Sequence, residues 1–111
     1  MLLKELGVVS YGPAARGEGV AAPSVQPCSD RRIWKIGGRD TEPNPYLGHR
    51  VRAQWLRPWG GKPAGFIVEG VLLATFAVNG GRTLIGEILL PDGRRISAPW
   101  SRNYLAVEVL G

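Results

Sequence analysis

Hydrophobic and polar residues alternate most regularly in the second half of the chain, and the clearest case is residues 49–56. One face of this segment is uncharged and largely apolar, whereas the other carries polar side chains up to its last residue, Leu56. Such alternation is typical of a half-buried strand, here with a basic outer surface. The residues expected inside are Val51, Ala53 and Trp55, and those expected outside are Arg50, Arg52 and Gln54.

Four further predicted strands follow, separated by residues that favour turns. Asn79-Gly80-Gly81 and Pro91-Asp92-Gly93 are turn segments, because Asn and Gly tolerate positive φ. Gly70 interrupts the longest run and predicts a bulge or bend. The predicted strands are residues 49–56, 66–78, 82–90, 94–98 and 105–110. The positions expected in the core are Val51, Trp55, Ile67, Val71, Leu84, Ile88, Ile96, Val107 and Val109.

The first 45 residues differ from the rest, because they are rich in Gly and Pro and show no sustained apolar period. We therefore expect an extended, mostly irregular arm over residues 1–45 and a folded domain over residues 46–111. Residues 12–27 are expected to run extended over a surface. Residues 32–36 alternate and suggest one short strand. Trp34 and Ile36 are expected to be buried against the folded domain or a neighbouring subunit, because an arm without its own core needs outside contacts to become ordered.

The folded part resembles the SH3-like small barrel. Its long first loop, tight hairpin between the third and fourth strands, and short connection before the fifth match that architecture. The segment from Pro99 to Val107, which contains Asn103-Tyr104, is similar to the Pro-x-Asn-Tyr-Val segment that ends SH3 domains. The resemblance implies an all-β, five-stranded SH3-like barrel. In that family the Pro and Tyr line a groove for proline-rich peptides, which corresponds to Pro99 and Tyr104. The chain lacks the family's Ala-Leu-Tyr-Asp-Tyr motif, and its first loop is basic instead of acidic.

Composition argues against an enzyme. The chain of 111 residues has one Cys and one His, so it offers neither an internal disulfide nor a zinc site built from several such ligands. Its carboxylates are scattered, and neither His49 nor Cys28 has the neighbours that catalysis would need. We expect no catalytic site, metal, cofactor or small-molecule substrate. The longest apolar run is residues 66–78, short of the roughly 20 residues of a membrane span. With no signal peptide recognisable, a cytoplasmic or virion location is expected.

Aromatic residues outside the predicted strands are the candidates for protein contacts. Trp59 and Trp100 lie in loop segments and Trp34 lies in the arm, and large exposed rings usually cover something. The predicted protein-interface residues are Ile33, Trp34, Ile36, Trp59, Pro99, Trp100 and Tyr104.

Basic residues give a second set of candidates. The formal net charge is +5, and residues 46–111 hold eight Lys and Arg against four Asp and Glu. Such an excess near Trp and Tyr is compatible with a phosphate backbone and stacked bases, although a solvated basic face is also compatible with it. The predicted nucleic-acid contacts are Arg50, Arg52, Arg57, Lys62, Arg94 and Arg95.

Three functions remain open on the sequence alone. The first is a non-catalytic assembly subunit, such as a bacteriophage virion protein, whose arm contacts neighbouring subunits in a homo-oligomer or larger particle. The alternative is a small nucleic-acid-binding barrel. The second alternative is a module that binds peptides in the manner of SH3 domains. None of the three involves a membrane.

Overall fold

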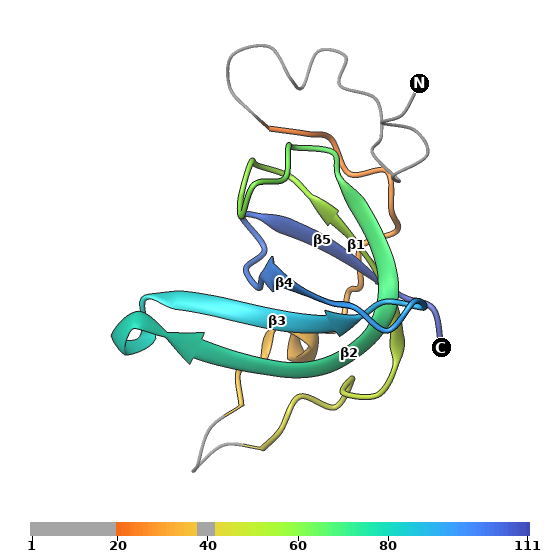
Figure 1. Cartoon of the computed structure of the whole chain (residues 1–111). Coiled ribbons are helices and arrows are strands. Elements are labelled where there is room, and N and C mark those ends of the chain that lie inside the picture. The colour runs from red at the N-terminus through yellow and green to blue at the C-terminus, as the bar shows by residue number, and fades with distance from the viewer. Residues whose placement is uncertain (1–19, 38–41) are drawn as a thin grey trace.

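Five antiparallel strands make up the fold (Figure 1). The computed structural model describes residues 20–37 and 42–111, so predictions for residues 1–19 and 38–41 lie outside the described residues. The all-β prediction is confirmed, and each observed strand matches its predicted range to within one residue at either end. The strands are β1 (Arg50–Trp55), β2 (Ile67–Val78), β3 (Thr83–Leu89), β4 (Arg95–Pro99) and β5 (Leu105–Val109). The 3₁₀ helices of the described residues are η2 (Arg31–Trp34) and η3 (Asn79–Gly81).

The sheet is open. Its strand order is β4-β3-β2-β1-β5, so β4 and β5 are the two edges and do not pair with each other. Strand β2 is long and bends through the middle of the sheet, pairing with β1 through residues 67–71 and with β3 through residues 71–78 (Figure 1). The bend brings β4 and β5 toward the same side of the core, with no strand pairing between them.

The irregularity in β2 is not where the sequence placed it. The sequence predicts a bulge or a bend at Gly70; the register with β3 shifts between Leu72 and Ala74, so the bulge lies a few residues further along the chain. Gly70 has a different role, because a Cβ atom at that position would collide with the carbonyl group of Leu89 and the side chain of Ile88. The glycine therefore permits β2 to pass close over the end of β3.

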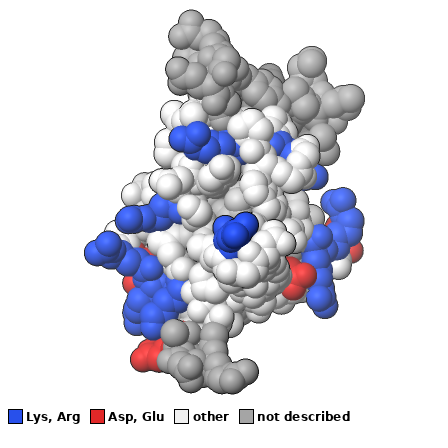
Figure 2. Space-filling view, turned by 90° about the vertical axis from the view of Figure 1, so that its left-hand side faces the viewer, with Lys and Arg blue, Asp and Glu red and all other residues white. Residues whose placement is uncertain are grey.

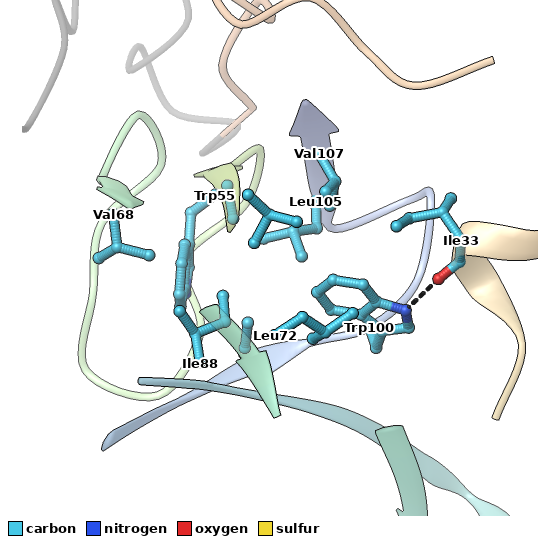
Figure 3. Packing of buried hydrophobic residues seen from close by; sticks show 11 residues of the cluster. Ile33, Trp55, Val68, Leu72, Ile88, Trp100, Leu105 and Val107 are labelled. Carbon is cyan, nitrogen blue, oxygen red and sulfur yellow. Dashed lines mark hydrogen bonds between the residues drawn. The ribbon is translucent and has the colours of Figure 1, made fainter. Parts of the chain in front are cut away.

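The core lies on the concave side of the bent sheet (Figure 3). Of the nine residues predicted there, four are fully buried: Val51, Trp55, Ile88 and Val107. Ile67 and Val71 are only half-buried, because β2 turns its Val68 and Leu72 side chains inward instead. The three other predicted core residues that are half-buried are Leu84, Ile96 and Val109.

The described part of the arm packs into this core. The predicted strand at residues 32–36 is wrong, because the chain forms η2 there with Asp30 as its N-cap. The helix places Ile33, which is 0% exposed, in the core cluster. The Trp100 indole Nε1 donates a hydrogen bond of 2.6 Å to the carbonyl oxygen of Ile33 (Figure 3). Trp34 and Ile36 pack against the same cluster but stay half-buried.

Residues 20–27 form no helix or strand and cross the outer surface of β1. The Gln54 side chain, expected in solvent, is 0% exposed because this segment covers it. Its Oε1 accepts a 2.6 Å hydrogen bond from the amide of Ser24, and its Nε2 donates a 2.8 Å bond to the carbonyl of Ala22. A buried side-chain amide whose two ends bond to one segment holds that segment in a single register.

The arm then crosses from one free strand edge to another. The Cys28 amide donates to the carbonyl of Val107 on the outer edge of β5, at 2.6 Å. Beyond η2, the Gly37 amide donates to the Thr75 carbonyl on β2, at 2.9 Å. The Thr75 hydroxyl in turn donates to the Lys35 carbonyl, at 2.7 Å. Residues 28–37 therefore bridge the free edge of β5 and the free side of β2.

Candidate functional site

The first loop and the connection between β4 and β5 meet at the end of β1. The Leu56 amide donates a 2.8 Å hydrogen bond to the Tyr104 carbonyl. Arg57 reaches the same connection, because its Nε donates a 3.2 Å bond to the Asn103 carbonyl. The Arg57 guanidinium lies 5.8 Å from the centroid of the Tyr104 ring, within the range of a cation–π contact. Tyr104 itself is 38% exposed.

A tight turn in the first loop places a second cation beside a second ring. Trp59 and Lys62 exchange two backbone hydrogen bonds of 3.0 Å around Gly60 and Gly61. Both glycines have positive φ, 62° and 81°, which a two-residue hairpin of this kind requires. Directly opposite residues of an antiparallel pair project to the same face, so the Trp59 and Lys62 side chains share one side of the turn. The Lys62 Nζ lies 5.4 Å from the centroid of the Phe66 ring.

Trp55 ties the turn to the core. Its indole Nε1 donates a 3.0 Å hydrogen bond to the Trp59 carbonyl, and its ring meets Phe66 edge-on with centroids 5.2 Å apart. The first loop is thus anchored while its cations remain at the surface. The residues that we call the loop surface are Arg57, Trp59, Lys62, Phe66, Arg102 and Tyr104.

Most of the predicted basic face is neutralised by the chain's own carboxylates. All six carboxylate side chains among residues 20–37 and 42–111 lie within 4 Å of a cation. Arg52 bonds to Glu69 at 2.6 Å, which raises the pKa of its guanidinium. The pairs are Asp30 with Arg32, Glu42 with Lys35, Glu69 with Arg50 and Arg52, Glu108 with Arg52, Asp92 with Arg94, and Glu87 with Arg95.

Five cations in the described part of the chain have no carboxylate partner. Of the predicted nucleic-acid contacts, only Arg57 and Lys62 belong to this group, and Arg102 was not among the predicted residues. Figure 2 shows the side on which the first loop lies: carboxylates accompany the Lys and Arg groups in the lower half, but not in the upper half. The unpaired cations are Arg31, Arg57, Lys62, Arg82 and Arg102.

The predicted protein-interface residues fall into two groups. Ile33, Pro99 and Trp100 are buried within the chain, and Trp34 and Ile36 pack half-buried beside them. The Trp34 and Trp100 ring centroids lie 5.4 Å apart. The structure gathers Ile33, Trp34, Ile36 and Trp100 where η2 packs on the core cluster, and Pro99 directly precedes Trp100. The other two, Trp59 and Tyr104, lie on the loop surface.

A surface that sequence reasoning missed is the end of the β2–β3 hairpin, which projects from the rest of the sheet around η3 (Figure 1). On the side of β2 facing away from β3, Gly37 bonds to Thr75, and within the described residues no backbone group pairs with β2 beyond that point. Ala77 and Val78 are both exposed there. The sequence does contain a signal for this projecting end. The predicted strand at residues 66–78 is longer than the strands that pair with it, so part of it has to extend beyond them.

Asp30 forms a compact polar cluster at the start of η2. Its carboxylate accepts a 2.7 Å bond from Arg32 Nη2 and a 2.6 Å bond from the Tyr46 hydroxyl. These hydrogen bonds, chiefly the one from Arg32, hold the pKa of Asp30 well below its usual value. The same carboxylate raises the pKa of Tyr46. The cluster fastens η2 to the segment that leads into β1.

Asp30→Asn is expected to destabilise the protein at neutral pH, with a deficit that shrinks in acid. A carboxylate whose pKa is lowered by folding stabilises the folded state above its unfolded pKa of about 3.9, and this contribution is lost as the pH falls toward the folded value. Asn retains an N-cap oxygen but no charge. Urea midpoints of both proteins at pH 7 and below about pH 3 test this expectation. An equal gap at both pH values would show that the Asp30 charge does not stabilise the fold.

The two candidate catalytic residues are Cys28 and His49. Cys28 is half-buried, and its Sγ lies 3.8 Å from the Asp30 carbonyl oxygen as a weak donor. His49 is exposed and meets the Tyr46 ring edge-on, with centroids 5.5 Å apart. Among the described residues, no three His, Cys, Asp or Glu side chains group as ligands for a metal ion. That same part of the chain holds no helix of the length and apolarity needed to cross a membrane.

Comparisons of the chain with protein-family models, with curated proteins and with solved structures give no match.

Proposed function

We propose that the protein is a non-catalytic structural subunit that joins other subunits of an assembly through the edge of its projecting β2–β3 hairpin. The observation that carries the proposal is the unpaired backbone of β2 beyond Thr75 within the described residues. An open strand edge is a template for a strand from another chain, and proteins that must stay monomeric usually block such edges with charged residues or proline. Residues 75–78, Thr-Phe-Ala-Val, contain neither.

The direction of the free backbone groups follows from the pairing. In an antiparallel ladder, alternate residues direct their amide and carbonyl groups to opposite neighbours. Since the Thr75 carbonyl accepts from Gly37, Ala77 directs its own groups to the same open side, whereas its neighbours bond toward β3. Val78, 36% exposed, adds apolar surface at the tip of the hairpin. A strand of another subunit can extend the sheet there.

We infer that the domain is a small SH3-like barrel left open between β4 and β5. The strand order β4-β3-β2-β1-β5 and the shared, bent β2 support this assignment. Ile33 and Trp100 belong to the same core cluster, so the arm takes part in completing the core. A bacteriophage virion subunit is the most specific form of the proposal, and it rests on the build of a small sheet with an arm. The peptide-binding alternative is less favoured, because Pro99 is buried and only Tyr104 of its two groove residues is exposed.

Ala77→Pro tests the hairpin edge. We expect the native chain to self-associate as its concentration rises, and Ala77→Pro to stay monomeric, because proline removes the amide that faces the open edge while the bonds of β2 to β3 remain. The measurement is size-exclusion chromatography with light scattering, alongside circular dichroism of both proteins.

Arg82→Ala is the matched control, since it alters the same hairpin without touching the edge, and it should associate as the native chain does. A native chain that remains monomeric at about millimolar concentration, or a folded Ala77→Pro variant that still associates, would count against assembly through this edge.

A further inference from the structure

We infer that the loop surface binds single-stranded nucleic acid. This inference is independent of the hairpin edge, and it uses a different part of the molecule from the predicted basic face. Arg50, Arg52, Arg94 and Arg95, expected to carry such binding, are occupied by Glu69, Glu108, Asp92 and Glu87. The free positive charge of the described residues is concentrated elsewhere.

Charge is the first argument. Three of the five unpaired cations, Arg57, Lys62 and Arg102, belong to the first loop and the β4–β5 connection, which the Leu56–Tyr104 hydrogen bond joins. No described carboxylate pairs with any of the three. A phosphate brought to this surface therefore displaces counterions and does not have to break an ion pair within the protein.

The aromatic rings are the second argument, and they decide between classes of anionic partner. Tyr104 is 38% exposed, and Trp59 and Phe66 are half-buried at the same end of β1. Cations interleaved with partly exposed rings suit a backbone of phosphates whose unpaired bases stack on the rings. An acidic peptide would use the cations alone, and duplex DNA keeps its bases stacked within the helix. The observations therefore favour a single strand.

The anchoring of the loop is the third argument. The Trp55 indole bond to the Trp59 carbonyl and the two Trp59–Lys62 backbone bonds hold the turn in place. Arg57 is fixed by its bond to the Asn103 carbonyl. Binding to such a surface orders few additional groups, so little of the interaction is lost to conformational entropy.

The test is fluorescence anisotropy of the full chain with labelled oligothymidylate and oligouridylate of about 15 nucleotides, over a salt series. We expect binding at about 50 mM salt, with log K falling against log salt with a slope of about −2 for three phosphate contacts. Lys62→Ala and Arg102→Ala should each lessen that slope by about 0.7. Tyr104→Ser should weaken binding about 5-fold or more through loss of stacking.

Arg82→Ala is the matched control, because it removes an equally unpaired cation from the hairpin end and should leave affinity and slope unchanged. Comparison of the two oligonucleotides shows whether DNA or RNA is preferred, and binding of either supports the inference. The inference is overturned by the absence of binding at about 50 mM salt. It is also overturned if Arg82→Ala weakens binding as much as Arg102→Ala does. A third contrary result is that Tyr104→Ser leaves the affinity unchanged and a polyglutamate peptide displaces the oligonucleotide as well as an unlabelled oligonucleotide does. Circular dichroism of each variant verifies that it is folded, and Tyr104→Phe, which keeps the ring, should restore the affinity lost in Tyr104→Ser.

Discussion

Trp100→Ala is expected to lower the free energy of unfolding by about 3 to 5 kcal/mol, the range typical of large aromatic residues removed from a core. Trp100 is 1% exposed, and its ring lies against Gly86, where any Cβ atom would collide with it. Its indole also bonds to the Ile33 carbonyl, so the variant loses a contact between the arm and the sheet together with buried area. Urea unfolding followed by far-UV circular dichroism measures the change.

Two comparisons show whether this cost comes from the position of the ring. Trp59→Ala removes a ring of the same size that is only half-buried, so it should cost less than half as much. Trp100→Phe keeps most of the apolar volume and loses the indole donor, while Asn44 Nδ2 still bonds to the Ile33 carbonyl at 2.7 Å. It should fall between the two alanine variants. Equal costs for Trp59→Ala and Trp100→Ala would contradict the central position given to Trp100.

The positions of the strands could be predicted because local signals define them. Alternation over residues 50–55 and the turns at residues 79–81 and 91–93 depend only on neighbours in the sequence. Asn79 and Gly80 have positive φ, which their residue types favoured from the outset. Such signals fix where a strand begins and ends, but they do not say which face of a uniformly apolar strand turns inward. In β2 both faces carry apolar residues, and the predicted phase of Ile67 and Val71 was wrong by one residue, although Glu69 between them marks their face as the outer one.

The arm shows what a local pattern leaves out. Asp30 is a favoured N-cap residue whose side chain accepts from the Arg32 amide, and this local signal prevailed over the alternation of residues 32–36. Gln54 alternates correctly as an outward residue of β1, yet it is buried because a segment about thirty residues earlier covers it. Nothing near Gln54 in the sequence indicates that cover.

Contacts between distant parts of the chain also decide which arginines are free to bind nucleic acid. Arg52 lies opposite Glu69 on β2 and Glu108 on β5, and only the registers of the three strands bring these side chains together. Sequence counting could find the excess of positive charge but not which arginines remain unpaired. The loop surface was partly predictable, since Arg57 and Lys62 lie in a Gly/Pro-rich loop without nearby acids. Arg102 was missed because its connection is far from that loop in sequence.

Ile33→Ala is expected to lower the free energy of unfolding by about 2 to 5 kcal/mol, although the residue lies in a segment without strand structure. Its side chain is 0% exposed and packs in the core cluster together with Trp100, which follows β4, and with Val107 on β5. If the arm and sheet form one cooperative unit, the whole unfolding curve should move to lower urea as a single transition. Far-UV circular dichroism, together with amide hydrogen exchange at Cys28 and Gly37, measures both parts, because these amides bond to β5 and β2.

Ser29→Ala is the matched control, since Ser29 is an exposed arm residue just before η2, and it should change stability by no more than about 0.5 kcal/mol. An Ile33→Ala variant as stable as Ser29→Ala would show that the arm is dispensable to the core. If, instead, the Cys28 and Gly37 amides exchanged quickly while the sheet kept its stability, the arm would unfold on its own. The expected result is that both amides lose protection together with the sheet, because Ile33 and Trp100 bury each other and neither the arm nor the strands complete the core alone.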